Sequence, residues 1–98
     1  MTSNFRVLGA GVWGLAFSDY LLKLGHNVEI FCRDTNLSNK NISGLKLSHV
    51  SEKNLMSLDT LNAQKSNGEI NIIAVNSKGF SDLLNKHESY FSTLDELV

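Results

Sequence analysis

Three glycines near the start of the chain could bind a ligand through the backbone alone. Residues 9–14 read GAGVWG, a G-x-G-x-x-G pattern, and follow an apolar segment. In such a pattern Gly9 allows a tight turn, Gly11 lets the main chain approach an anion, and Gly14 lets a helix pack closely on a strand. The first N–H groups of a helix have no internal partners, and its dipole favours negative charge there. The pattern therefore predicts a site for the pyrophosphate of a dinucleotide.

A second candidate position follows the apolar segment 28–32. In NAD-binding units an Asp or Glu commonly stands about 20 residues beyond the glycines and binds the ribose 2′-hydroxyl. Here that place falls on Cys32, which Arg33 and Asp34 follow. The Arg33 guanidinium could pair with the 2′-phosphate of NADP, which favours NADP over NAD. Asp34 as an alternative ribose ligand keeps NAD open.

The elements that must position these residues follow a strand–helix–strand order. Residues 5–8 are mostly apolar and predict a first strand, and residues 12–24 carry the broad apolar face of a helix. Gly25 stands where a helix-terminating glycine is expected. The β-branched and aromatic segment 28–32 predicts a second strand. This unit has the size of one βαβ crossover.

The second half of the chain extends the same sheet. Residues 34–54, rich in Asn and Ser, predict a long loop that has room for one helical turn, and residues 55–58 predict a short strand followed by a short helix. The continuous apolar core of residues 69–76 is typical of a parallel strand covered on both faces. A further helix is predicted to begin at Ser77. The expected fold class is therefore α/β: a Rossmann-type, doubly wound parallel sheet of about four strands, incomplete.

Length and composition limit the classes of function. The 98 residues suffice for one small domain, and the net charge of −1 without a basic stripe argues against a nucleic-acid partner. The apolar segments are too short to span a bilayer. A single cysteine allows no internal disulfide and favours a reducing, cytoplasmic setting.

Residues 7–34, VLGAGVWGLAFSDYLLKLGHNVEIFCRD, resemble the N-terminal cofactor domain of glycerol-3-phosphate dehydrogenases. Trp13 is the discriminating residue, because dinucleotide-binding turns rarely carry tryptophan there. The Gly-His turn at residues 25–26 and the Arg-Asp pair at residues 33–34 also fall at family positions. Residues 71–80, NIIAVNSKGF, resemble the family's fourth strand and the turn after it, with Asn76 in place of a proline.

The resemblance implies a cytoplasmic enzyme of phospholipid biosynthesis that moves hydride between NAD(P)H and dihydroxyacetone phosphate. The family's catalytic lysine, its substrate-binding lysine, its fifth strand and its second domain are expected beyond residue 98. Residues 1–98 are therefore expected to be a cofactor-binding fragment without a catalytic residue, and dihydroxyacetone phosphate or glycerol 3-phosphate would bind only to a full-length protein. The cofactor-binding positions implied are Gly9, Ala10, Gly11, Val12, Trp13, Gly14, Arg33, Asp34, Val75 and Asn76.

Other polar residues show no spacing for a nucleophile triad or a metal site. Lys78 is expected to be a solvated residue at a helix start, and His26 to lie in a helix-ending turn. His49 falls in the long loop, His87 on an apolar helix face, and Cys32 is expected to be a small buried residue.

Two alternatives to the enzyme fragment stay open. The chain could be a non-catalytic nucleotide-binding or interaction module that forms a homodimer through exposed sheet edges. It could also be the cofactor domain of another NAD(P)-linked dehydrogenase, of the hydroxyacid or ketopantoate type.

Overall fold

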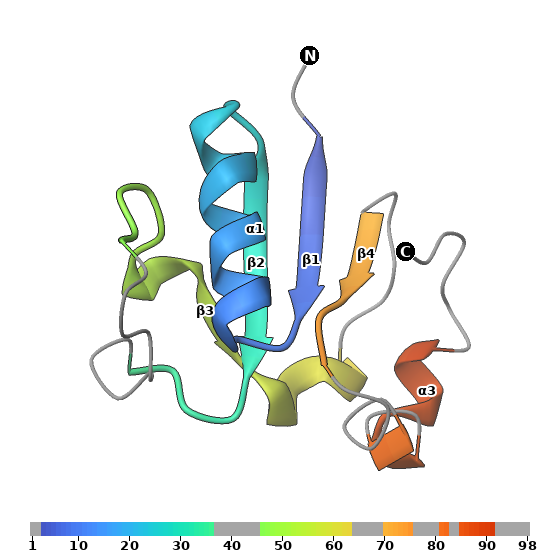
Figure 1. Cartoon of the computed structure of the whole chain (residues 1–98). Helices are drawn as coiled ribbons and strands as arrows, with labels where there is room; N and C mark the ends of the chain where they lie inside the picture. The colour runs from blue at the N-terminus through green and yellow to red at the C-terminus, as the bar shows by residue number, and fades with distance from the viewer. Residues whose placement is uncertain (1–2, 37–45, 64–69, 76–80, 83–84, 92–98) are drawn as a thin grey trace.

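The structure is a computed structural model, and four parallel strands form one sheet in it (Figure 1). The strand order is β3-β2-β1-β4, so the chain starts in the middle of the sheet and builds outward in both directions. The strands are β1 (Asn4–Leu8), β2 (Asn27–Cys32), β3 (Leu55–Ser57) and β4 (Ile70–Ile73). The residues described are 3–36, 46–63, 70–75, 81–82 and 85–91. The predicted α/β parallel sheet is confirmed.

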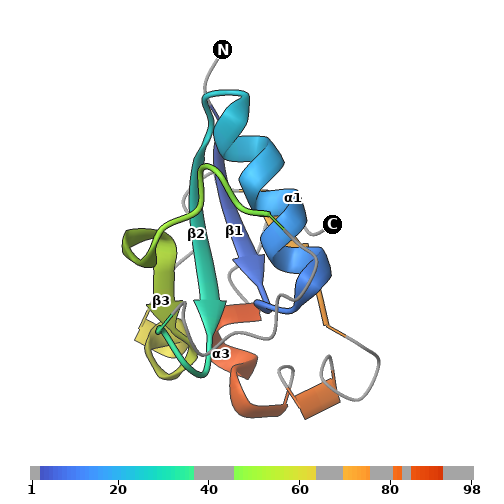
Figure 2. The same ribbon diagram turned by 60° about the vertical axis from the view of Figure 1, so that its left-hand side comes forward.

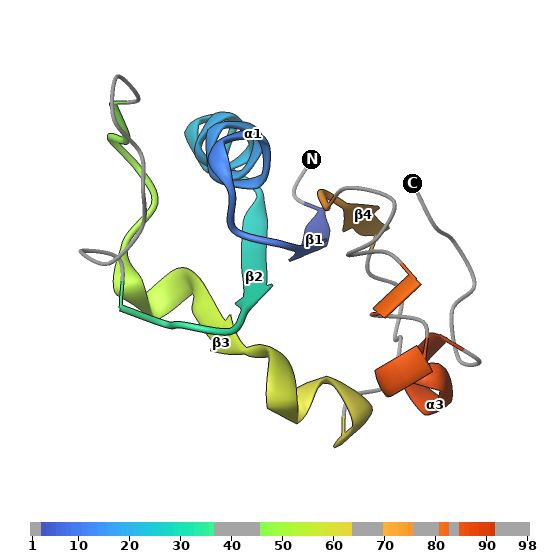
Figure 3. The same cartoon turned by 60° about the horizontal axis from the view of Figure 1, so that its bottom comes forward.

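The helix α1 (Val12–Lys23) covers one face of this sheet (Figure 3). Its buried Leu15 and Leu21 pack with inward-facing strand residues such as Val7 and Ile30, which are fully buried. Burial of this apolar stripe fixes the helix on the sheet, because each buried leucine side chain contributes roughly 1.5–3 kcal/mol.

The end of α1 confirms the predicted helix-terminating glycine. Gly25 has a φ of 91°, a left-handed conformation that favours glycine. Its N–H donates to the Leu22 carbonyl at 3.0 Å, and the His26 N–H donates to the Leu21 carbonyl at 3.1 Å. These two bonds form a Schellman motif, which satisfies carbonyls that the helix leaves open.

The opposite face of the sheet is covered by two short helical elements, the 3-10 helix η3 (Leu58–Ala63) and α3 (Glu88–Phe91). Leu8 and Phe31 of the sheet pack there against Leu61 of η3 and Tyr90 of α3, and all four are fully buried. The strand arrows point toward the side of the molecule where η3 and α3 lie (Figure 2). Both elements therefore stand near the carboxyl ends of the strands.

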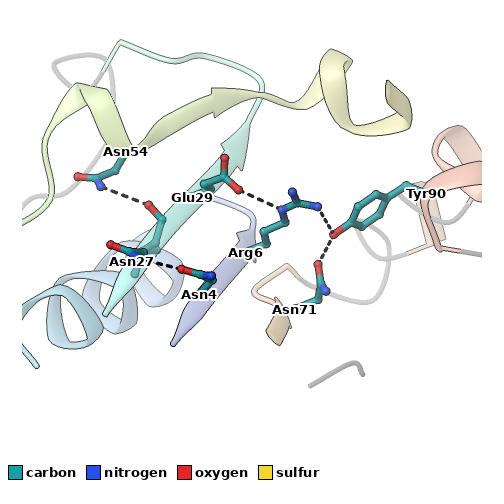
Figure 4. Close-up of polar contacts among 8 residues, drawn as sticks. Asn4, Arg6, Asn27, Glu29, Asn54, Asn71 and Tyr90 are labelled. Atoms are coloured by element: carbon teal, nitrogen blue, oxygen red, sulfur yellow. Dashed lines mark hydrogen bonds and ion pairs between the residues drawn. The ribbon is translucent and has the colours of Figure 1, made fainter. Parts of the chain in front are cut away.

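A row of polar residues crosses this second face and binds α3 to the sheet (Figure 4). The strand register places Arg6 beside Glu29 on one side and Asn71 on the other. Arg6 Nε donates to Glu29 Oε1 at 3.0 Å, and Arg6 Nη1 donates to the Tyr90 hydroxyl at 3.4 Å. The Tyr90 hydroxyl in turn donates to Asn71 Oδ1. The Tyr90 hydroxyl thus links two buried polar residues, Arg6 of β1 and Asn71 of β4, and Arg6 also pairs with the partly exposed Glu29 of β2.

Several predicted boundaries differ from the structure. The strand predicted over 69–76 spans only Ile70–Ile73, and residues 69 and 76 lie outside the described part. The predicted loop 34–54 contains a 3-10 helix, η2 (Glu52–Asn54), whose start is capped by Ser51. The helix predicted after Ser77 is represented by residues 81–82 and 85–86, and the chain leaves helical geometry at His87 before α3 begins.

Candidate cofactor-binding site

The turn that leaves β1 requires glycine at two positions because of the fold itself. Gly9 has a φ of 121°, and its N–H donates to the Phe31 carbonyl at 2.9 Å. A Cβ added to Gly9 would stand 2.6 Å from the Ala74 carbonyl oxygen, a distance that real Cβ atoms do not reach. A Cβ on Gly14 would overlap the carbonyl oxygen of Gly9. Gly9 and Gly14 therefore let β1, β4 and α1 approach one another closely.

Gly11 differs from the other two because nothing in the protein demands glycine there. It is the N-cap of α1, with a φ of −77° and a ψ of −170°, an extended conformation open to any residue. A Cβ added there would meet no heavy atom of the described residues within 4 Å. The space in front of Gly11 is thus open to a ligand, and a side chain would occupy it.

The same open space faces the amino-terminal end of α1. The first N–H groups of a helix have no intrahelical partners, and their dipoles favour an anion. Within α1, which the structure describes in full, the first turn carries no acidic residue, and the N-cap contributes no side-chain hydrogen bond. These unmatched donors fit the diphosphate of a dinucleotide.

A cleft of about 610 Å³ extends from this turn along the carboxyl ends of the strands. It brings together five of the ten residues predicted from the sequence, namely Gly9, Ala10, Arg33, Asp34 and Val75. In open parallel sheets ligands bind where the strand order reverses, outside the carboxyl ends of the strands. Here β1 lies between β2 and β4, so the cleft occupies that position.

Three of the remaining predicted residues line a second groove of about 550 Å³, whereas Gly14 is buried and lines neither hollow. Gly11, Val12 and Trp13 form one wall of it, and residues 72–75 form the other. Trp13 is 81% exposed and lies beside the edge strand β4, away from Arg33 and Asp34. Val75 borders both hollows, and Asn76 lies outside the described residues.

Among the described residues, the charged side chains around the cleft give it a slight excess of negative charge. Arg33 and Lys86 contribute two positive charges, and Asp34, Asp59 and Asp82 contribute three negative charges. The Asp34 carboxylate accepts the Asn36 N–H at 2.9 Å, which shapes the turn after β2. Where the structure describes the chain, no group of three or more His, Cys, Asp or Glu residues could hold a metal ion.

His87 is a cleft residue whose position in the site the sequence did not reveal. The spacing of apolar residues around it predicts an apolar helix face, and the residue is buried, with 6% of its surface exposed. Its Nδ1 is buried without a hydrogen-bond partner among the described residues. Burial lowers the pKa of His87 and the neighbouring Lys86 lowers it further, while Asp59 acts in the opposite direction. The imidazole is therefore neutral at pH 7.

Asp19 is a second residue whose contacts the sequence did not indicate. Its Oδ1 accepts three consecutive backbone N–H groups, from Ser48 at 3.1 Å, His49 at 2.7 Å and Val50 at 2.9 Å. Burial raises the pKa of Asp19, but the hydrogen bonds from residues 48–50 outweigh it and bring the pKa below its usual value. These hydrogen bonds hold residues 48–50, which belong to the connection between β2 and β3, against α1.

Fold and site together define an α/β domain of the dinucleotide-binding type, with a glycine turn at the carboxyl ends of a parallel sheet. The family model described as NAD-dependent glycerol-3-phosphate dehydrogenase N-terminus matches residues 4–98. The chain belongs to this family, which confirms the resemblance drawn from Trp13 and its neighbours. No curated protein and no solved structure matches the chain. No helix in the described segments is long and apolar enough to cross a membrane.

Proposed function

We propose that this chain binds NAD as the cofactor-binding part of a glycerol-3-phosphate dehydrogenase, with the diphosphate at the start of α1. The observation that carries the proposal is Gly11. The fold requires glycine at positions 9 and 14 but not at position 11, where a Cβ would project into open space beside unpaired amides and would hinder an approaching ligand. Family membership gives that ligand its chemical class.

The cofactor is proposed to lie across the switch point in a defined direction. The amides of residues 11–14 bind the diphosphate, and Gly9 and Ala10 lie beneath it. The adenosine half extends along the cleft toward Arg33 and Asp34 at the end of β2, as in other dinucleotide-binding units. The nicotinamide half extends toward the end of β4, where Val75 and Asn76 are the proposed contacts.

Between the two cofactors left open by the sequence, the charges in the cleft favour NAD. Among the described residues of the cleft, three aspartates outnumber Arg33 and Lys86, and the 2′-phosphate of NADP would add roughly two negative charges to them. A ribose 2′-hydroxyl has no such penalty and can donate to a carboxylate such as that of Asp34.

The substrate belongs to the proposal as well. Bound NADH supplies a hydride, and the family relationship points to dihydroxyacetone phosphate as its acceptor in a full-length, cytoplasmic protein. None of the motifs described above contains the catalytic lysine that is expected in this family. We therefore expect the 98 residues to bind cofactor without turning over substrate.

Isothermal titration calorimetry with NADH and NADPH tests the binding proposal. The expected result is saturable binding of NADH and weaker binding of NADPH by the folded chain. Absence of binding with both cofactors, in a sample whose circular dichroism shows a folded α/β domain, would refute it. Oxidation of NADH by dihydroxyacetone phosphate, followed at 340 nm, would contradict only the expectation of no turnover.

A second candidate function rests on the edge strand β4. Trp13, Val12 and Phe17 are exposed beside it, and an exposed apolar surface next to a sheet edge favours self-association. On this alternative the chain is a non-catalytic module that forms a homodimer. Light scattering over a dilution series separates the two: a stable dimer that does not bind NADH supports the alternative, and a monomer that binds NADH excludes it.

A further inference from the structure

A line of large apolar side chains runs along the exposed side of α1. Its members, exposed by 81%, 37%, 57% and 54% in chain order, are Trp13, Phe17, Tyr20 and Leu24, which together are called the α1 stripe. Leu24 belongs to the line because it continues the right-handed helical backbone as the C-cap, with a φ of −78° and a ψ of −2°. The spacings of four, three and four residues keep all four side chains on one face of the helix. No described element covers this face, which is turned away from the sheet (Figure 3).

The α1 stripe is large enough to form half of a specific protein interface. Aromatic side chains present about 150–250 Å² each, so the exposed fractions leave roughly 500 Å² of apolar surface in water. Apolar patches of this size on a folded domain are often functional. Two such stripes in contact would bury roughly 1,000 Å², which reaches the lower limit for a specific interface.

The order of residues along the stripe fits a second copy that runs in the opposite direction. The outer and inner residues share one midpoint, so reversal places Trp13 opposite Leu24 of the other copy and Phe17 opposite Tyr20. A large ring then meets a smaller side chain at each end, and two rings meet in the middle. Alternating spacings of three and four suit helices that pack nearly along one another. Antiparallel helices also bring opposite ends of their dipoles together, whereas a parallel pair would oppose Trp13 to itself.

We propose that two copies of this chain form a dimer by antiparallel packing of their α1 stripes, around a twofold axis between Phe17 and Tyr20. Such a contact is closed, because each copy uses the same surface. No charged side chain belongs to the stripe, and a net charge of −1 causes little repulsion between copies. None of the four stripe residues lines the cleft at the carboxyl ends of the strands, so the dimer is compatible with cofactor binding there.

Sedimentation equilibrium over a dilution series tests the dimer on the unmodified chain. An interface at the lower size limit should give a dissociation constant of roughly 10–100 μM. Trp13, the single tryptophan of the chain, reports on the stripe itself. Its fluorescence should shift to shorter wavelength as the dimer forms, because the ring leaves water. A chain that stays monomeric well above this concentration range would overturn the proposal.

Tyr20→Glu tests the surface, because the twofold axis brings two like charges close together. It should weaken the dimer by at least roughly tenfold while the circular dichroism of the domain stays unchanged. Lys53→Glu is the control, since it places a glutamate on the exposed side of η2, outside the stripe, and should leave the dimer intact. A dimer that persists unchanged in Tyr20→Glu would use another surface, such as the edge of β4, and would refute the proposal.

Disulfide cross-linking tests the antiparallel order. Under oxidation, a mixture of Trp13→Cys and Leu24→Cys chains should form a mixed disulfide-linked dimer, and neither variant should do so alone. The wild type is the control, because its one cysteine, Cys32, is buried. A cross-link between two Trp13→Cys chains, or no mixed cross-link at concentrations where sedimentation shows a dimer, would refute the arrangement.

The outcomes separate this inference from the proposed function, because the dimer does not depend on the cofactor. Calorimetric titration of NADH into the dimeric chain should show the same affinity as titration into the monomeric Tyr20→Glu variant. A monomer that binds NADH leaves the proposed function standing and refutes the dimer. A dimer that satisfies the Tyr20→Glu and cross-linking tests but does not bind NADH supports this inference and refutes the proposed function.

Discussion

Replacement of Gly11 by alanine separates what the fold needs from what a ligand needs. The φ of −77° at this residue suits alanine, and its Cβ would contact no described atom within 4 Å. Glycine-to-alanine replacement at a compatible position stabilises by about 0.4–1 kcal/mol through the unfolded chain. Alanine is a poorer N-cap than glycine by a similar amount, about 0.5–1 kcal/mol. The two effects offset each other, so the free energy of unfolding should change by less than about 0.5 kcal/mol.

Binding of NADH should respond differently, because the added methyl group would occupy the space in which the diphosphate approaches the backbone. Loss of one charge-assisted amide–phosphate hydrogen bond costs about 1.5–3 kcal/mol, which corresponds to roughly a 10- to 100-fold weaker Kd. Urea denaturation without ligand and calorimetric titration with NADH measure the two quantities on the same sample.

Gly9→Ala is the matched control. Its φ of 121° and the Ala74 carbonyl oxygen 2.6 Å from the added Cβ make alanine costly in the free protein. We expect a loss of more than about 2 kcal/mol of stability, from backbone strain and displacement of the carbonyl. If Gly11→Ala bound NADH as tightly as the wild type, the assignment of the diphosphate to the start of α1 would be refuted.

Three further predictions concern the rest of the domain. Asp19→Asn should cost about 1–2 kcal/mol at pH 7; because the folded pKa of Asp19 is lowered, the difference from wild type should fade as the pH falls below about 4, and urea titrations at pH 7 and pH 3 check this. Tyr90→Phe removes the hydroxyl between Arg6 and Asn71 and should lower stability by about 1–2 kcal/mol in urea denaturation, whereas an unchanged midpoint would show that the network contributes nothing. Asp34→Asn removes one negative charge from the cleft and should strengthen NADPH binding relative to NADH roughly fivefold by calorimetry, about 1 kcal/mol; no change in the ratio would contradict the charge argument.

The sequence predicted the strand–helix–strand unit around the glycine turn, because the types and spacing of neighbouring residues determine that unit. Period and composition identified β1, α1 and β2, and the spacing of Gly9, Gly11 and Gly14 assigned a separate role to each. In the structure Gly9 and Gly14 lie at close approaches of the backbone, and Gly11 faces open space. The approach of Gly14 to Gly9 is local in the chain, whereas the close neighbour of Gly9 is the distant Ala74.

The sequence could not predict contacts between distant segments. Asp19 lies in α1, and only the folded chain brings the amides of residues 48–50 to it. Arg6 is a charged residue in the otherwise largely apolar β1, and the strand register places it between Glu29 and Asn71. His87 kept helical spacing with apolar residues, so its place in the cleft was hidden. None of these partners leaves a signal in local spacing.

The central claim is that unpaired amides at the start of α1 bind a diphosphate, and backbone amide NMR with ADP-ribose tests it most directly. The N–H resonances of Gly11, Val12, Trp13 and Gly14 should shift together and yield one common Kd. The amides of His26 and Asn27, in the turn at the opposite end of α1, should not move. Saturable binding of ADP-ribose that left the four α1 amides unchanged would contradict the account.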